Sequence, residues 1–507
     1  MDKKLIDKRI IAIIAILAAA FVLLLLMRPA PPSSLPASNT LRPSPGSSGE
    51  ICLDITRSQA EAAAAASECA QGKLKETGVC NEGTRTWWID LDLEKEGCNP
   101  ACVIHIAKPL SAEINWRCTG LLPSGPQNRL DDSEATDMGV GELVAGNNEF
   151  ALDFYNKITE EDQGNIFFSP WSLESALSMT MEGARGQTFD EMLSVLHLPK
   201  DLAVRGPAFA RLMNELNAPG KPYQLSTANA LWPEKTYPFL DDYFALVGKY
   251  YGGKLENLDY RNDVEGSRRI INTWVESRTM GKIKDLIPIG ILTPMTRLVL
   301  TNAIYFKGSW ATQFNKTLTR EADFKVMPSK IVKVPMMYQS ADFKYLDEAN
   351  LQLLEMPYKG NNLSMVILLP KTRIADLEAS LTIDKLEAWR RSAYETKVKV
   401  YIPKFESKTK YFLKDVLSDM GMPTAFDVAD FSGMDGTRNL RISEVIHQAY
   451  VSVDEEGTEA TAATAVIIMK VAIMEPTVFR ADRPFIYLIM KGDTILFMGR
   501  VMDPTEL

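Results

Sequence analysis

The cysteines of this chain occupy one short part of its sequence. All six lie between residues 52 and 118, and the rest of the 507-residue chain holds none. An even number of cysteines in a small segment predicts a disulfide framework, because a core of that size is marginal without cross-links. The part after residue 118 must instead rely on a hydrophobic core of its own. The predicted disulfide cysteines, whose pairing the sequence leaves open, are Cys52, Cys69, Cys80, Cys98, Cys102 and Cys118.

A zinc site is the alternative use of these cysteines. Cys98 and Cys102 lie close together, and His105 follows them. Structural zinc sites take four Cys or His ligands at paired spacings. The other cysteines are scattered, so we favour disulfides and expect no metal.

The segment around the cysteines predicts one helix on a small antiparallel sheet. Ser58–Ala70 is rich in alanine and favours a helix. Three later stretches alternate as strands do, and they are Thr86–Leu93, Cys102–Ile106 and Ala112–Cys118. The tryptophans of this segment could form a binding face, but in so small a module we expect them in the core. They are Trp87, Trp88 and Trp116.

An uninterrupted apolar run extends from Ile10 to Met27. At about 1.5 Å per residue a helix of this length reaches roughly 27 Å, close to the hydrocarbon thickness of a bilayer. A cleaved signal peptide is the alternative, but the run is long for one and Met27-Arg28-Pro29 lacks a small-residue cleavage pattern. Basic residues precede the run, so we expect a signal anchor with a cytoplasmic N terminus and an exported remainder. The alternative leaves the protein secreted.

Composition divides the remainder. Residues 28–49 are rich in Pro, Ser and Gly and predict a linker, and residues 121–140 predict a second one. The expected organisation is a cytoplasmic N terminus at 1–9, a transmembrane anchor at 10–27, a linker at 28–49, a cysteine-rich module at 50–120, a linker at 121–140 and a large domain at 141–507.

Charge and motif content exclude several functions. The formal net charge is -9, whereas a nucleic-acid surface needs clustered Lys and Arg. The chain has only three histidines and no G-x-S-x-G, P-loop, H-E-x-x-H or G-x-G-x-x-G motif. We therefore expect no enzyme, no cofactor and no nucleic-acid partner.

The segment from Glu455 to Met474 is unusual for its small and β-branched residues. With the two-residue period of a strand, one face begins at Thr458 and carries no charge as far as Ile468. An alanine-rich helix or a flexible linker is the alternative. Composition alone favours that alternative, but the Thr, Val and Ile content of the second half and Pro476 at its end also allow a strand that becomes buried late.

Several motifs of the large domain occur in the order typical of one known family. They are Asn165-Ile-Phe-Phe-Ser-Pro-Trp-Ser-Leu173, Met181-Glu-Gly-Ala-Arg-Gly-Gln-Thr188, Thr301-Asn-Ala-Ile-Tyr-Phe-Lys-Gly-Ser-Trp310, Phe479-Arg-Ala-Asp-Arg-Pro-Phe485 and Phe497-Met-Gly-Arg-Val-Met-Asp-Pro504. Together with the small-residue segment just before the last two of them, they make residues 141–507 resemble the serpin family of serine-protease inhibitors.

This resemblance implies an α+β fold with three β-sheets, about nine helices and an exposed reactive loop. It also implies a suicide-substrate mechanism, in which a serine protease cleaves the loop and the loop then inserts into the main sheet. The inhibitor supplies no catalytic group. We expect a monomer whose partner is a serine protease. The alternative is a non-inhibitory serpin-like protein that binds a partner or acts as a chaperone.

The resemblance also assigns roles to single residues. The hinge of the loop comprises Glu455, Glu456, Gly457, Thr458, Glu459, Ala460, Thr461 and Ala462. Residues at the sheet opening and in a polar cluster below it are Lys404, Trp310, Ser169, Ser172, Asn302 and His447.

Family spacing places the reactive bond between Val471 and Ala472, which would suit an elastase-like or subtilisin-like protease with a small apolar pocket. A shift of one residue gives Lys470–Val471 and a trypsin-like target.

Overall fold

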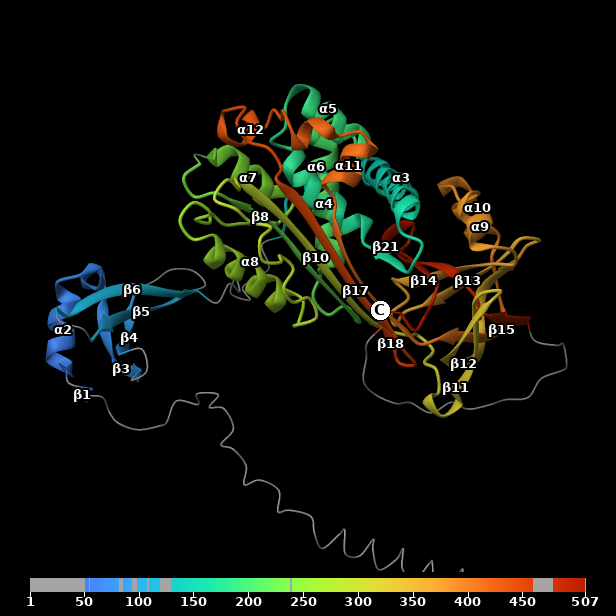
Figure 1. Cartoon of the computed structure of the whole chain (residues 1–507), viewed down its shortest axis with the longest axis horizontal. Coiled ribbons are helices and arrows are strands. Elements are labelled where there is room, and N and C mark those ends of the chain that lie inside the picture. The colour runs from blue at the N-terminus through green and yellow to red at the C-terminus, as the bar shows by residue number, and fades with distance from the viewer. Residues whose placement is uncertain are drawn as a thin grey trace, which may run out of the picture. The chain divides into compact units, whose positions relative to one another are not determined.

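The computed structural model describes residues 51–53, 55–81, 85–93, 98–106, 109–118, 129–237, 239–458 and 477–506 (Figure 1). They fall into two compact units, one within residues 1–125 and the other within 126–507. The predicted anchor at 10–27 and the loop from Glu459 to Met474 lie outside the described residues. Within the described part, no helix is long and apolar enough to cross a membrane.

The smaller unit is a four-stranded antiparallel sheet in the order β3-β4-β5-β6 with one helix packed on it. The helix begins at a capping box of Thr56 and Gln59, and it buries Ala60 and Ala64. The first strand of the sheet was not predicted. The elements are β1 (Ile51–Cys52), β2 (Ile55–Thr56), α2 (Arg57–Ala65), η1 (Glu68–Gln71), β3 (Lys73–Asn81), β4 (Thr86–Asp92), β5 (Cys98–His105) and β6 (Ser111–Cys118).

Two disulfides cross-link this unit, Cys52–Cys80 and Cys69–Cys102. The zinc alternative is wrong, because the sulfur of Cys102 is bonded to Cys69 and is not available to a metal. Cys98 and Cys118 are opposite each other on β5 and β6, but their side chains lie outside the description. Of the tryptophans, Trp87 is buried in the core and Trp88 is half-buried. The side chain of Trp116 is not among those described.

The larger unit contains a six-stranded sheet in the order β16-β17-β18-β10-β8-β9. Both of its faces are covered, since Ala230 and Trp232 pack with Ile271 of a helix on one face while Leu231 joins the main core on the other. The strands are β8 (Tyr223–Pro233), β9 (Lys254–Leu255), β10 (Leu298–Ser309), β16 (Phe405–Phe412), β17 (Glu444–Val453) and β18 (Gly457–Thr458).

The second sheet of this unit has nine strands. Its order is β19-β15-β12-β13-β14-β20-β21-β7, and β11 pairs with β12. The long strand β12 pairs with β15 and, near its end, with β13, so it joins two parts of this sheet. The three predicted sheets therefore correspond to the six-stranded sheet and these two parts. The strands are β7 (Ile166–Phe168), β11 (Arg320–Met327), β12 (Lys330–Asp347), β13 (Leu351–Pro357), β14 (Ser364–Pro370), β15 (Tyr394–Pro403), β19 (Thr477–Arg480), β20 (Phe485–Lys491) and β21 (Thr494–Val501).

The described part of the larger unit has ten α-helices, against about nine implied by the resemblance. The first of them begins at Asp137, inside the range predicted as a linker. The helices are α3 (Asp137–Glu161), α4 (Pro170–Met181), α5 (Gly186–Val195), α6 (Leu202–Leu216), α7 (Asp241–Tyr250), α8 (Val264–Arg278), α9 (Ile374–Glu378), α10 (Ile383–Ser392), α11 (Lys414–Met420) and α12 (Ser432–Asp435), with 3-10 turns η2 (Lys316–Leu318) and η3 (Pro423–Phe426).

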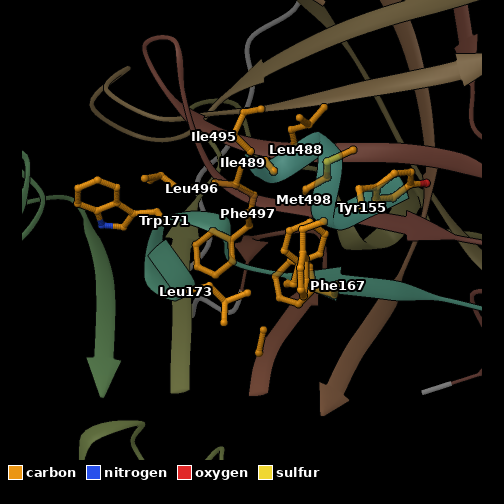
Figure 2. Close-up of a cluster of buried hydrophobic side chains, with 14 of the residues drawn as sticks. Tyr155, Phe167, Trp171, Leu173, Leu488, Ile489, Ile495, Leu496, Phe497 and Met498 are labelled. Atoms are coloured by element: carbon orange, nitrogen blue, oxygen red, sulfur yellow. The ribbon is translucent and has the colours of Figure 1, made fainter. Parts of the chain in front are cut away.

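Helix α4 lies at the centre of the core, and all of its residues are buried. It begins where Ser169 accepts a hydrogen bond from the backbone N–H of Ser172, with Pro170 in the first turn. Figure 2 shows aromatic and aliphatic side chains of β7, α4 and β21 packed together, and the rings of Phe167 and Phe497 stack with centroids 5.4 Å apart. Buried polar side chains at the end of this helix have partners on other helices.

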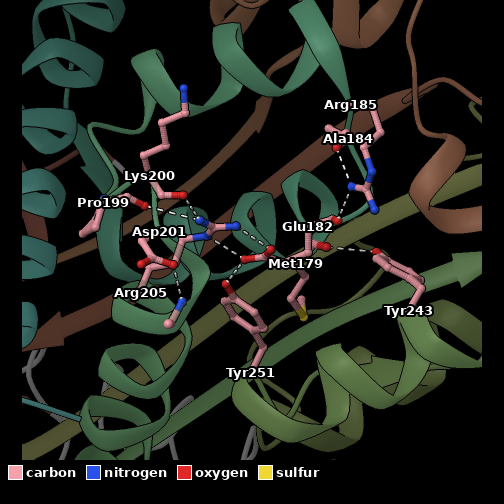
Figure 3. A network of polar contacts seen from close by, with 11 residues as sticks. Met179, Glu182, Ala184, Arg185, Pro199, Lys200, Asp201, Arg205, Tyr243 and Tyr251 are labelled. Atoms are coloured by element: carbon pink, nitrogen blue, oxygen red, sulfur yellow. Dashed lines mark hydrogen bonds and ion pairs between the residues drawn. The ribbon is translucent and has the colours of Figure 1, made fainter. Parts of the chain in front are cut away.

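One such partner set joins the end of α4 to α6 and α7 (Figure 3). Glu182, just after α4, receives hydrogen bonds from Arg205 at 2.6 Å and from the hydroxyl of Tyr251 at 2.5 Å. Arg205 also donates to the backbone oxygen of Lys200 at 2.6 Å. Loss of either Glu182 or Arg205 would leave an unpaired buried charge, so this pair holds the helices behind the six-stranded sheet in one arrangement.

Candidate functional site

The chain reverses direction just after β17. Asp454 forms the turn, because its carboxylate accepts hydrogen bonds from the backbone N–H groups of Glu456 and Gly457 at 2.9 and 3.2 Å. The short strand β18 then runs back between β10 and β17, with Gly457 opposite Ser309 and Thr458 opposite both Gly308 and Val453. We call this end of the six-stranded sheet the sheet opening.

Gly457 is required by the close approach of two strands. Its φ is 154°, and a Cβ there would lie 2.1 Å from the backbone oxygen of Gly308 and 2.6 Å from the Cα of Ser309. Both distances are far shorter than a van der Waals contact, and the atoms concerned belong to the backbone of β10 and cannot move aside. Only glycine therefore allows β18 to occupy this place.

A buried carboxylate holds the sheet opening together. Glu455 forms an ion pair with Lys404 at 2.8 Å and accepts a hydrogen bond from Thr319 at 2.7 Å. Burial raises the pKa of Glu455, but the hydrogen bonds from Lys404 and Thr319 outweigh it, and the pKa lies below its ordinary value. Beside this pair, Lys316 contacts the carboxylate of Glu456.

Trp310 closes the same end from β10. Its backbone N–H donates to the oxygen of Glu456, and its indole N–H donates to the oxygen of Asp454, both at 3.0 Å. The ring is 2% exposed and stacks on Tyr358 with centroids 4.7 Å apart. One side chain therefore ties the turn after β17 to β10.

Further down the sheet, five side chains form a closed hydrogen-bonded group, which we call the central polar cluster. Asn302 donates to the hydroxyl of Ser172 at 2.7 Å and to the side-chain oxygen of Asn229 at 2.6 Å, and its own oxygen contacts Nδ1 of His447. The hydroxyl of Ser169 donates to the backbone oxygen of Leu496 at 2.6 Å. The members are Ser169, Ser172, Asn229, Asn302 and His447.

His447 is neutral in this cluster. Its Nε2 accepts a hydrogen bond from the backbone N–H of Ser169 at 3.2 Å, so Nδ1 carries the hydrogen that Asn302 receives. Complete burial lowers the pKa of His447 to about 3, although its contact with Asn302 raises it slightly. The cluster is therefore uncharged throughout the physiological pH range.

The cluster spans three neighbouring strands. Asn302 lies directly opposite Asn229 on β8 and opposite His447 on β17. Below the sheet opening, β10 and β17 pair directly and in parallel. A strand inserted between them must break this ladder and the contact between Asn302 and His447.

Comparisons with known proteins agree with this geometry. The family model described as serpin (serine protease inhibitor) matches residues 145–504. The chain belongs to the serpin family. An uncharacterised serpin-like protein of Thermococcus kodakarensis is 44% identical over 371 residues, which cover 72% of this chain and 86% of that one. The leukocyte elastase inhibitor of Equus caballus is 40% identical over 380 residues, which cover 72% of this chain and all of the inhibitor.

Solved serpin structures share the fold. Serpin48 of the insect Tenebrio molitor is 31% identical with a TM-score of 0.66, and the match covers 72% of this chain and 98% of that one. Thyroxine-binding globulin from human has the same TM-score and identity over 73% of this chain. The serpin fold thus spans the larger unit, and the smaller unit lies outside the region matched by the family model.

The residues assigned by the serpin resemblance come together in two places. Glu455, Lys404 and Trp310 meet at the sheet opening with Glu456, Gly457 and the backbone of Thr458. Ser169, Ser172, Asn302 and His447 meet in the central polar cluster. The remaining assigned residues lie outside the described part of the chain, and they are Glu459, Ala460, Thr461, Ala462, Lys470, Val471 and Ala472.

Three residues of the candidate site were not predicted from the sequence. Asn229 is an isolated polar residue in the apolar stretch Ala228–Trp232, and that contrast was a signal for a buried hydrogen-bonding role. Thr319 and Lys316 lie in a loop after β10 and carried no comparable signal. Their roles depend on where that loop passes.

Proposed function

We propose that this serpin is a suicide-substrate inhibitor of serine proteases, exported and tethered to a membrane by its N-terminal apolar segment. The observation that supports it best is β18. The hinge already occupies the first position of an antiparallel strand between β10 and β17. Further insertion would continue a strand that exists, rather than start a new one.

The length of the loop is compatible with this mechanism. If the register of Thr458 opposite Gly308 continues, Val471 comes opposite Met295, just before β10 begins at Leu298. The segment up to the predicted reactive bond is therefore as long as the strand it would complete. The face that begins at Thr458 carries no charge as far as Ile468, so this part of it can be buried without desolvating a charge, and Lys470 comes only at its end.

The chemistry belongs to the protease. Its serine oxygen attacks the carbonyl carbon of Val471, the bond to Ala472 breaks, and the new amine takes the proton that the protease histidine received from the serine. An ester to Val471 remains. Insertion of the freed segment then carries the protease away before water hydrolyses the ester, and the inhibitor needs no catalytic group.

The target is a protease with a small apolar pocket, elastase-like or subtilisin-like, if Val471 is the residue before the cleaved bond. The relatives named leukocyte elastase inhibitor support this choice for the family. Lys470 in that position would select a trypsin-like protease. The mass of the peptide released on cleavage distinguishes the two.

Thr458→Arg tests the mechanism. Thr458 begins the face that enters the sheet, so an arginine must lose its water early in insertion, at a cost of several kcal/mol. Each 1.4 kcal/mol or so slows insertion about tenfold. We expect the variant to be cleaved and released as a substrate, measured as loss of the SDS-stable complex with an unchanged cleavage site.

Glu459→Arg is the matched control, because residue 459 falls on the opposite face and should tolerate the charge. An SDS-stable complex of Thr458→Arg at the wild-type yield would show that insertion is not the mechanism. A non-inhibitory serpin is the alternative outcome. It would give no complex in either protein, and its thermal midpoint would not rise after cleavage in the loop, whereas an inserting serpin becomes more heat-stable.

A further inference from the structure

The outer face of one part of the nine-stranded sheet is aromatic and basic. Along β15, Val398 and Val400 are buried, whereas Lys397 is exposed and Lys399 is half-buried. The period of two places these lysines and Tyr401 on the outer face. Figure 1 shows β12 and β15 on the side of the larger unit away from α8.

A ladder of three side chains crosses this face. Tyr338 on β12 is opposite Tyr401 on β15, which is opposite Arg480 on β19. The two rings have centroids 4.9 Å apart, and the guanidinium carbon of Arg480 lies 3.8 Å from the centroid of Tyr401. Stacking on Tyr401 holds the guanidinium over the sheet while its charge remains available.

The neighbouring cross-strand positions on this face carry two lysines and one exposed valine. Lys399 is opposite Ser340 on one side and opposite Val478, which is 46% exposed, on the other. Lys397 is opposite Asp342, but between described residues no ion pair joins them, and none involves Lys399. On a chain with a formal charge of -9, this is a locally positive surface.

Strand β19 begins at Thr477, directly after the reactive loop. Thr477 is six positions after Val471, and extended backbone spans about 20 Å over six positions. A specific interface buries about 800 Å² on each partner, which requires contacts beyond the loop itself. A protease bound to the predicted bond therefore lies within reach of this face.

We propose that the outer face of β12, β15 and β19 is a docking surface for an acidic patch on the target protease. It consists of Tyr338, Lys397, Lys399, Tyr401, Val478 and Arg480. The proposal rests on the proposed inhibitory function and adds a property of the partner, negative charge beside its active site. Charges of this kind act on the rate of encounter, and the trapping step is independent of them.

Reversing the two lysine charges tests this surface. The double variant Lys397→Glu/Lys399→Glu and the wild type are each mixed with a panel of elastase-, subtilisin- and trypsin-like proteases. For the protease that forms an SDS-stable complex, we expect the association rate constant to fall about tenfold at low ionic strength. In about 1 M NaCl, where the screening length is about 3 Å, the two rates should converge. The number of inhibitor molecules consumed per protease should not change.

The matched control uses single substitutions. Lys408→Glu makes the same charge change on an exposed position of β16 in the other sheet, and it should slow association much less than Lys399→Glu. Equal slowing by both would overturn the proposal, because it would reflect net charge alone. An unchanged rate for the double variant at low ionic strength would also overturn it while leaving inhibition intact. If the wild type itself forms no complex with any protease, the proposed function fails instead, and the docking surface fails with it.

Discussion

The sheet opening and the central polar cluster lie along the same two strands, β10 and β17, and are held by different kinds of contact. At the opening, Lys404 and Glu455 form an ion pair in which the lysine side chain is 38% exposed. In the cluster, Ser172, Asn302 and His447 are completely buried and uncharged. The opening therefore depends on a buried carboxylate whose lysine partner is reached by solvent, whereas the cluster depends on a closed set of neutral hydrogen bonds.

This difference predicts different responses to pH, salt and substitution. An ion pair with one partner in contact with solvent contributes little and is partly screened by salt. Salt does not screen a closed neutral network, but protonation or removal of one member leaves buried groups without partners. The opening is thus the easier place for insertion to begin, and the cluster is the larger barrier to its progress.

The largest expected effect is on the pH dependence of the free energy of unfolding, to which the central polar cluster should contribute more than the sheet opening. Because burial lowers the pKa of His447 from 6.5 to about 3, the unfolded chain binds a proton there that the folded protein does not. Its stabilisation is complete above pH 6.5 and is lost as pH falls towards 3, by about 1.4 kcal/mol per unit and about 5 kcal/mol at most. Urea unfolding at a series of pH values measures this. His447→Gln should flatten the curve, and His197→Gln, at an exposed position, should keep most of it. Equal slopes in wild type and His447→Gln would contradict the prediction.

Removal of the central amide has the next largest effect. Asn302→Ala leaves the Nδ1 hydrogen of His447 without a partner, and it removes one of the two donors to the side-chain oxygen of Asn229, which keeps its hydrogen bond from Ser172. Each unpaired buried group costs about 1–3 kcal/mol, so the free energy of unfolding should fall by about 2–4 kcal/mol. Denaturant unfolding at neutral pH checks this.

The control for Asn302→Ala is Asn262→Ala, which removes an exposed amide bonded only to nearby Asp259. It should change the free energy of unfolding by less than about 0.5 kcal/mol. Similar losses in the two variants would mean that the cluster contributes no more than the surface does.

At the sheet opening the expected effect is smaller. Glu455→Gln removes the charge pair with Lys404 and should cost about 1 kcal/mol. The pKa of Glu455 is lowered in the folded protein, so this contribution is present above pH 4.5 and is lost as pH falls through the lower folded value. The difference between wild type and Glu455→Gln should shrink with added NaCl. A difference that salt does not alter would place Glu455 in the same class as the central cluster.

Reduction of the disulfides is expected to have no effect on inhibition. No cysteine follows Cys118, so a mild reductant that opens Cys52–Cys80 and Cys69–Cys102 should leave inhibition unchanged. Complex formation with a protease before and after reduction measures this. A loss of inhibition would contradict the prediction.

The order of motifs along the chain identified the fold before any contact was known. The serpin resemblance named Lys404, Glu455 and Trp310 together, and the structure places them at one end of the six-stranded sheet. The same approach missed Asn229 and Thr319. Neither lies in a motif used for the resemblance, and the partners of each are far away in sequence.

The sequence by itself determined that the chain is a serpin with a separate cysteine-bearing segment, because motifs and residue types are properties of the linear chain. Only the tertiary structure decided which cysteines pair, that Gly457 lies against the backbone of Gly308, and that Tyr338, Tyr401 and Arg480 form one ladder. These contacts depend on the register between strands that are far apart in sequence. Register is set by the packing of whole faces, which no short motif records.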